Sequence, residues 1–157
     1  MKHIGNLTIT KQNADDFKAL EEVTGWLDIS ADSNLPALTS VGCWLGIFAD
    51  SDLPALTSVG GGLDIRAESN LPALTSVGGW LNIYAEAALP ALKVAYGANG
   101  QLVAVKKYGL WRSDDGLYYA GCKGPLTLEK ARRLAQVWGE QEIAQFFIKA
   151  IEESKND

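Results

Sequence analysis

Few side chains in this sequence have the type and spacing that catalysis or metal binding requires. The single histidine, His3, lies in an N-terminal segment that we expect to be mobile, and no spacing supplies partners for a catalytic triad or a multi-histidine metal site. Cys43 and Cys122 lie far apart and match no metal-binding or redox spacing. Cys122, beside Lys123, is open to two interpretations, a reactive thiol or a small residue at a turn. We therefore expect no metal site, no cofactor and no enzymatic activity.

Carboxylates outnumber the bases, and their distribution indicates binding rather than catalysis. A carboxylate pair acts in acid–base catalysis when an apolar pocket separates the two pKa values, and the sequence implies no such pocket. The net charge is −5, but residues 15–92 hold eleven acids and two bases, whereas residues 93–157 hold eight acids and ten bases. The negative field over residues 15–92 favours a basic partner. We do not expect direct nucleic-acid binding, for which only bases of the C-terminal part remain: Lys106, Lys107, Arg112, Lys123, Lys130, Arg132 and Arg133.

These acids belong to a repeat that organises the first half of the chain. One pattern is written three times, as LPALTSVGCWLGIFADSD from Leu35, LPALTSVGGGLDIRAESN from Leu53 and LPALTSVGGWLNIYAEAA from Leu71. Each copy begins 18 residues after the previous one, with no insertion. A fixed period of this length is typical of a solenoid, in which each coil buries its apolar side against its neighbours.

Alignment of the coils by their period separates inward from outward positions. Within the pattern W-L-D-I-S, alternation directs Leu and Ile into the core and Trp, Asp and Ser outward. Parallel strands of successive coils would stack about 4.8 Å apart, with right-handed crossovers. The predicted inward columns are Phe17/Leu35/Leu53/Leu71/Leu89, Leu20/Leu38/Leu56/Leu74/Leu92, Val23/Val41/Val59/Val77, Leu27/Leu45/Leu63/Leu81 and Ile29/Ile47/Ile65/Ile83.

The two ends of the chain depart from the repeat. We expect a first capping strand at residues 5–10 and a short helical turn within residues 13–23 that closes the stack. Predicted elements beyond Leu92 are strands at 93–96 and 101–106, a hairpin pairing 110–112 with 117–119, and helices at 127–138 and 140–154. The predicted fold is mainly β with α (α+β): a right-handed parallel β-solenoid of leucine-rich coils at residues 1–95, capped at 96–157 by the hairpin and two α-helices. That C-terminal part either plugs the solenoid or forms a small second module.

One outward face of the solenoid carries the strongest candidate binding residues. Tryptophan, tyrosine and arginine are enriched at interface hot spots, and a large exposed apolar patch usually marks a contact surface. The alternatives are that the rings merely stack across strands or that the C-terminal part covers them. The candidates on this face are Trp26, Asp28, Trp44, Phe48, Asp64, Arg66, Trp80 and Tyr84.

An acidic column runs beside this face. Like charges about 4.8 Å apart repel, so the column costs stability unless it attracts something basic. The alternative is a solvated edge that only keeps the protein soluble. Its members are Asp32, Asp50, Glu68 and Glu86, with Asp52 nearby.

Two resemblances accompany these patterns. The repeat, LxxLTSVGGxLxIxAxxxLPxL over residues 5–95, resembles the leucine-rich, β-helical repeats of receptor L-domains and related bacterial proteins. Its coils are shorter than is usual there and lack paired cysteines, which argues against an extracellular receptor. Residues 115–151, DGLYYAGCKGPLTLEKA with the helices that follow, resemble a C-terminal segment of phage and prophage repeat proteins. The second resemblance implies a phage origin.

The function predicted from these observations is a non-enzymatic protein-binding module. Its acidic and aromatic face would dock onto a basic or nucleic-acid-binding protein, and with a phage origin this becomes an inhibitor of a bacterial defence complex, a DNA mimic of the anti-CRISPR kind. The alternatives are a structural or self-associating phage or bacterial repeat protein, dimeric through the aromatic face, and an enzyme with a pocket around Trp111, Tyr118, Tyr119 and Cys122. With no apolar leader and no apolar run of roughly 20 residues, we expect a cytoplasmic protein that does not bind membranes.

Overall fold

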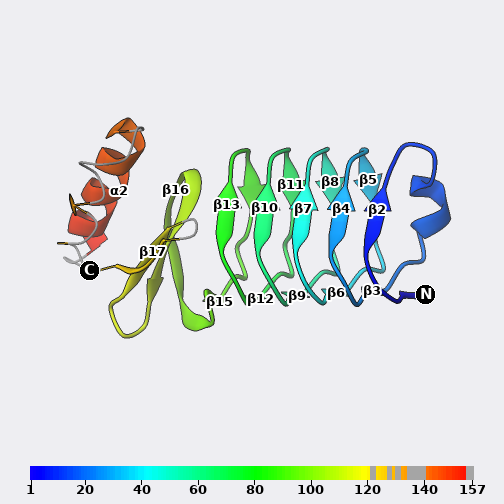
Figure 1. Ribbon diagram of the computed structural model, residues 1–157, viewed down its shortest axis with the longest axis horizontal. Helices are drawn as coiled ribbons and strands as arrows, with labels where there is room; N and C mark the ends of the chain where they lie inside the picture. The colour runs from blue at the N-terminus through cyan, green and yellow to red at the C-terminus, as the bar shows by residue number, and fades with distance from the viewer. Residues whose placement is uncertain (121–122, 127–128, 130–131, 134–140, 155–157) are drawn as a thin grey trace.

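The computed structural model describes residues 1–120, 123–126, 129, 132–133 and 141–154. Residues 1–95 form a parallel β-solenoid whose coils stack along one axis (Figure 1). Each regular coil has three short strands separated by corners, because the chain turns three times within one 18-residue period. Only one of these three strands, the segment Leu-x-Ile, was predicted from the sequence.

The strands of successive coils align into three parallel faces. The first face comprises β1 (Lys2–His3), β3 (Glu22–Val23), β6 (Ser40–Val41), β9 (Ser58–Val59), β12 (Ser76–Val77) and β15 (Val94–Ala95). The second face comprises β2 (Leu7–Ile9), β4 (Leu27–Ile29), β7 (Leu45–Ile47), β10 (Leu63–Ile65) and β13 (Leu81–Ile83). The third face comprises β5 (Ser33–Asn34), β8 (Ser51–Asp52), β11 (Ser69–Asn70) and β14 (Ala87–Ala88).

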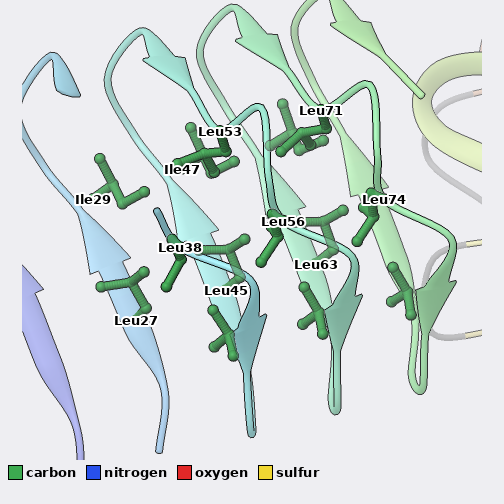
Figure 2. Close-up of a cluster of buried hydrophobic side chains, with 14 of the residues drawn as sticks. Leu27, Ile29, Leu38, Leu45, Ile47, Leu53, Leu56, Leu63, Leu71 and Leu74 are labelled. Atoms are coloured by element: carbon green, nitrogen blue, oxygen red, sulfur yellow. The ribbon is translucent and has the colours of Figure 1, made fainter. Parts of the chain in front are cut away.

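The register between coils is the one that the period predicts. Leu63 pairs with Leu45 on one side and with Leu81 on the other, so each residue meets its equivalent one period away. The inward columns of leucine, valine and isoleucine fill the interior, where most members are 0–2% exposed (Figure 2). Only Phe17 and Leu89, the two ends of one column, are partly exposed, because a neighbouring coil covers them on one side.

The corner before each strand of the second face is held by close backbone contacts between coils. A Cβ on Gly60 would come within 2.1 Å of the carbonyl oxygen of Gly42, so only glycine fits in that stack. At the corner before each strand of the first face, the hydroxyl of Thr57 donates to the carbonyl oxygen of Thr39 at 3.0 Å, and that of Thr75 donates to the carbonyl oxygen of Thr57 at 3.1 Å. These repeated polar residues therefore satisfy corner carbonyls.

A short cap closes the N-terminal end of the stack. The 3₁₀ helix η1 (Ala14–Phe17) replaces the arm of the regular coil, as predicted for residues 13–23. The expectation that His3 is mobile is wrong, because β1 pairs with β3 and places His3 opposite Val23. The His3 ring also meets the Phe17 ring edge-on, with centroids 6.2 Å apart.

The C-terminal hairpin closes the opposite end. One long strand, β16 (Ala98–Ser113), replaces the two strands predicted at 101–106 and 110–112, because it runs antiparallel to both β15 and β13. It then pairs with β17 (Tyr118–Ala120), as predicted, and β17 pairs with an additional strand, β18 (Lys123–Leu126). Trp111 is fully buried in the same core cluster as the coils, so the hairpin continues the solenoid core.

Helix α2 (Gln141–Ser154) packs against β16, beyond the last coil (Figure 1). It corresponds to the predicted helix at 140–154, and Ile151 is buried as expected. The helix predicted at 127–138 lies for the most part outside the described residues, as does Cys122. None of the helices in the described part of the chain combines the length and the apolar character needed to span a membrane.

Candidate functional site

The second face presents three outward columns of side chains, which follow from the register of its strands. In the direction from β4 to β13 they are Trp26/Trp44/Gly62/Trp80, Asp28/Gly46/Asp64/Asn82 and Ser30/Phe48/Arg66/Tyr84. Three of the aromatic side chains remain open, with 36% of Trp26 and 41% each of Phe48 and Tyr84 exposed. The C-terminal part therefore does not cover these three side chains.

Arg66 lies between two aromatic rings of neighbouring coils. Its guanidinium carbon is 5.6 Å from the centroid of Phe48 and 5.0 Å from that of Tyr84. Both distances allow a cation–π contact, so the exposed column Phe48–Arg66–Tyr84 is a continuous stack over β7, β10 and β13. Each of its three members holds the next in position.

Asp64 fixes this stack from within the face. The Nε–H of Arg66 donates to both carboxylate oxygens of Asp64, at 3.2 and 3.3 Å. This hydrogen bond, and then the negative charge, raises the pKa of Arg66 above its usual value. Asp64, a candidate binding residue, is only 5% exposed, because Arg66 and the neighbouring side chains cover it. Asp64 therefore positions Arg66 and cannot itself contact a large partner.

Trp44 and Trp80 of the first outward column lie on positions that lack a side chain. A Cβ on Gly46 would come within 2.1 Å of Cη2 of Trp44, and one on Gly62 within 2.4 Å of Cε2 of Trp80. The Trp44 ring reaches along its strand to Phe48, with centroids 6.0 Å apart. These contacts make one contiguous surface, which we name the aromatic–arginine cluster. Its members are Trp44, Phe48, Arg66 and Tyr84, and Trp80 lies over Gly62.

Trp26 and Asp28 stand apart from this cluster, on the N-terminal side. The carboxylate of Asp28 accepts a hydrogen bond of 3.0 Å from the hydroxyl of Ser30 and is half-buried. No ring contact joins Trp26 to another aromatic side chain in the described part of the chain. The outward side chains over β7, β10 and β13 therefore hold one another in place, whereas Trp26 and Asp28 over β4 lie outside these contacts.

A groove of about 1040 Å³ runs along the third face, around the corner from the cluster. Its acidic side chains are Asp32, Asp50, Asp52, Glu68 and Glu86, and serine, asparagine and alanine residues with Ile83 complete the lining. The four members of the predicted column are exposed, whereas Asp52 is half-buried and accepts a hydrogen bond of 3.0 Å from the Asn70 amide. Because Glu68 lies two residues beyond Arg66, this acidic groove and the cluster share one edge.

Three of the four residues considered for an enzymatic pocket are packed against other parts of the structure. Trp111 is 0% exposed and Tyr118 is 4% exposed, and Tyr119 stacks on Tyr96 with centroids 4.9 Å apart. Cys122, the fourth residue of that hypothesis, lies outside the described residues. Among the described residues, no group of three or more His, Cys, Asp and Glu side chains is placed to hold a metal ion.

Two of the bases considered for nucleic acid are neutralised within the C-terminal part. Arg132 forms an ion pair with Glu152, and Arg133 forms one with Glu129 at 2.8 Å. Arg112 is half-buried on β16. The side chains of Lys106, Lys107, Lys123 and Lys130 lie outside the described set.

The members of the cluster follow from the sequence, but the way in which they are held does not. Gly46 and Gly62 accept the rings of Trp44 and Trp80, a contact that was not predicted. A usable signal was present, since glycine stands at an outward strand position beside tryptophan in both cases. The pairing of Asp64 with Arg66 was also accessible, because residues two apart on a strand face the same side.

Comparison of the chain with family models, with curated proteins and with solved structures returns no match. The leucine repeat and the 18-residue coils are properties of this structure, and the resemblances to L-domain repeats and to phage proteins gain no support from a relative.

Proposed function

We propose that this chain is a non-enzymatic protein-binding module that uses the aromatic–arginine cluster together with the acidic groove. The observation that carries the proposal is the exposed Phe48–Arg66–Tyr84 stack, which Asp64 holds from below. Exposed aromatic and arginine side chains supply most of the binding energy at many interfaces. The proposal contains no catalytic step.

Rigidity is the reason to expect affinity from so few residues. Ordering a flexible side chain at an interface costs about 0.5–1.5 kcal/mol. In the cluster this ordering is already present, because Arg66 is held at Nε and between two rings, and Trp44 lies over Gly46. A partner therefore meets a surface that needs little rearrangement.

The partner that fits this surface is a protein with a basic patch around an apolar centre. The acidic groove and the excess of acids in residues 15–92 would attract positive charge, and the cluster would fill the apolar centre. A nucleic-acid-binding protein has such a patch. The phage inhibitor of a bacterial defence complex is the most specific form of this hypothesis and depends on the resemblance of residues 115–151.

The location that we propose is the cytoplasm. Cys43 is a free, exposed thiol, and exposed thiols persist in reducing compartments.

The test is a comparison of matched truncations on a captured partner. The immobilised protein is used to isolate a partner from host lysate, and the dissociation constant of the purified pair is then measured by calorimetry. Phe48→Ala with Tyr84→Ala should weaken binding at least about 30-fold, the loss of a single hot spot. Ile4→Ala removes an even more exposed apolar side chain, 73% exposed, at the N-terminal end and should leave binding unchanged. Equal affinity of both variants and the parent would exclude this face.

The groove is tested separately through kinetics. Asp50→Asn with Glu68→Gln should lower the association rate and flatten its dependence on salt, while the dissociation rate stays nearly constant. An unchanged association rate at low salt would remove electrostatic steering from the proposal.

A second candidate function is self-association through the same face. Trp26, Phe48 and Tyr84 all open on one side of the solenoid, which is the arrangement that a two-fold homodimer would bury. Light scattering distinguishes the two functions: a dimer mass that Phe48→Ala with Tyr84→Ala returns to the monomer would assign the face to a second copy.

A further inference from the structure

The first strand of the second face has a neighbouring strand on one side only. β2 pairs with β4, and the bonds from Leu7 N to Trp26 O and from Ser30 N to Ile9 O, both 2.9 Å, show that Leu7 and Ile9 direct their backbone groups toward β4. Alternate residues of a strand point their backbone groups to opposite sides. The backbone groups of Asn6, Thr8 and Thr10 therefore point toward the N-terminal end of the solenoid.

Side chains bind the carbonyl oxygens of Asn6 and Thr8 and the amide of Thr10 among these outward groups. Nδ2 of Asn13 donates to the carbonyl oxygen of Thr8 at 3.0 Å, and the Thr10 amide donates to Oδ1 of Asn13 at 2.7 Å. Nε2 of His3 lies 3.0 Å from the carbonyl oxygen of Asn6, and because a carbonyl only accepts, this nitrogen is the donor. The amide of Asn13 supplies one donor and one acceptor, as the backbone of a next strand would.

Two further elements hold these side chains against β2. The amides of Asn13 and Ala14 both donate to the carbonyl oxygen of Thr10, at 3.2 and 3.0 Å, which fixes the start of η1 beside the strand (Figure 1). His3 is held by the pairing of β1 with β3 and by its edge-on contact with Phe17.

The opposite end of the solenoid is closed by backbone pairing. β16 pairs with β13 through Asn82 and Ile83, and with β15 through Val94 and Ala95. The two ends of the second face thus use different devices: an antiparallel strand at the C-terminal end and two side chains at the N-terminal end.

We propose that Asn13 and His3 block the β2 edge against a second copy of this chain. An uncovered strand edge is a template for pairing with another chain. Without the two side chains, the β2 edges of two copies can pair antiparallel about a two-fold axis. A two-fold contact uses the same edge of both copies, and β16 already occupies the edges of β13 and β15, so pairing through β2 stops at two copies. This inference is independent of the proposed function.

The test measures solution mass against concentration for the full chain. Asn13→Ala with His3→Ala should double the mass relative to the parent, and Asn34→Ala, which changes an exposed asparagine of β5, should leave it unchanged. In the double variant, Thr8→Pro should restore the parent mass. Proline removes the amide that points out of the free edge, away from β4, and it leaves the pairing with β4 intact.

Several outcomes would overturn the inference. A double variant that keeps the parent mass while the Thr10 amide loses its protection from hydrogen exchange has an open edge that does not pair. Growth beyond the doubled mass, or doubling that Thr8→Pro does not reverse, would show association through another surface. If the double variant loses its β-sheet circular dichroism, Asn13→Asp replaces it in the mass measurement. Aspartate keeps the acceptor for the Thr10 amide but removes the donor to the Thr8 carbonyl oxygen.

Discussion

The indole of Trp80 lies across Gly62 of the preceding coil, so closely that a Cβ on Gly62 would come within 2.4 Å of ring atom Cε2. This contact joins β10 and β13 on the outer face, where the core leucines play no part. It also keeps Trp80 only partly exposed and leaves Arg66 and Tyr84 free to stack beside it.

Gly62→Ala should displace the Trp80 ring. We expect a loss of about 1–3 kcal/mol in the free energy of unfolding, the usual cost of overpacking a filled site, together with a changed tryptophan emission spectrum. Urea denaturation followed by fluorescence measures both effects. In a Trp80→Ala background the same glycine change should cost much less, and an equal cost in both backgrounds would contradict the contact.

Trp111→Ala should destabilise the coils as well as the hairpin. The side chain is fully buried in the shared core cluster, and truncation of such a ring costs about 3–5 kcal/mol. Because the core is continuous, denaturation followed by circular dichroism and by fluorescence should give one coincident transition at a lower midpoint. Trp111→Phe loses the 3.2 Å hydrogen bond from Nε1 to the Ala98 carbonyl oxygen but keeps an aromatic ring. Its midpoint of denaturation should lie between those of the parent and of Trp111→Ala. Two separate transitions would instead indicate an independent C-terminal module.

Thr57→Val should weaken the corner between coils. Valine keeps the shape of the side chain but removes the hydroxyl that donates to the Thr39 carbonyl at 3.0 Å, a loss of about 0.5–1.5 kcal/mol. Thr57→Ser keeps the hydroxyl and is the matched control for urea denaturation. If the two substitutions cost the same, the hydrogen bond contributes nothing measurable.

Neutralisation of the acidic column should stabilise the isolated protein. Asp50 and Glu68 are exposed on neighbouring coils, so their like charges repel. Asp50→Asn with Glu68→Gln should raise the free energy of unfolding at low ionic strength by less than about 1 kcal/mol, seen as a higher melting temperature. This gain should shrink as salt screens the charges. A gain that persists at high salt would have to come from another source, such as packing.

Much of the architecture was predictable because a solenoid is nearly one-dimensional. Each coil must fit the same cross-section, so the inward leucine, valine and isoleucine columns repeat with the period, and the alternation in Leu63-Asp64-Ile65 separates the two sides of a strand. The two-residue strands of the first and third faces escaped prediction, because Ser58–Val59 and Ser69–Asn70 are too short for alternation to show. The single strand β16 was also missed, since Gly100 and Gly109 suggest breaks that pairing with β13 and β15 overrides.

The binding face was predicted by residue type and corrected in its arrangement. Alternation places Phe48, Arg66 and Tyr84 on the outside, but it does not report which outward side chains cover one another. Asp64 is buried because Arg66 of its own strand and the side chains of adjacent coils close over it. Such coverage depends on rotamers and on contacts between coils, which have no periodic signature.

The period and alternation of the chain are thus sufficient to assign the solenoid, its register and its core. These features recur in every coil, so several copies of one pattern support the same assignment. Features that occur only once in the chain were decided by the tertiary structure. Asn13 meets the backbone of Thr8 and Thr10, and Trp111 enters the core, through contacts specific to the two ends. At an end the neighbouring coil is missing, so the chain must satisfy open backbone groups and exposed apolar surface with whatever side chains its fold brings there.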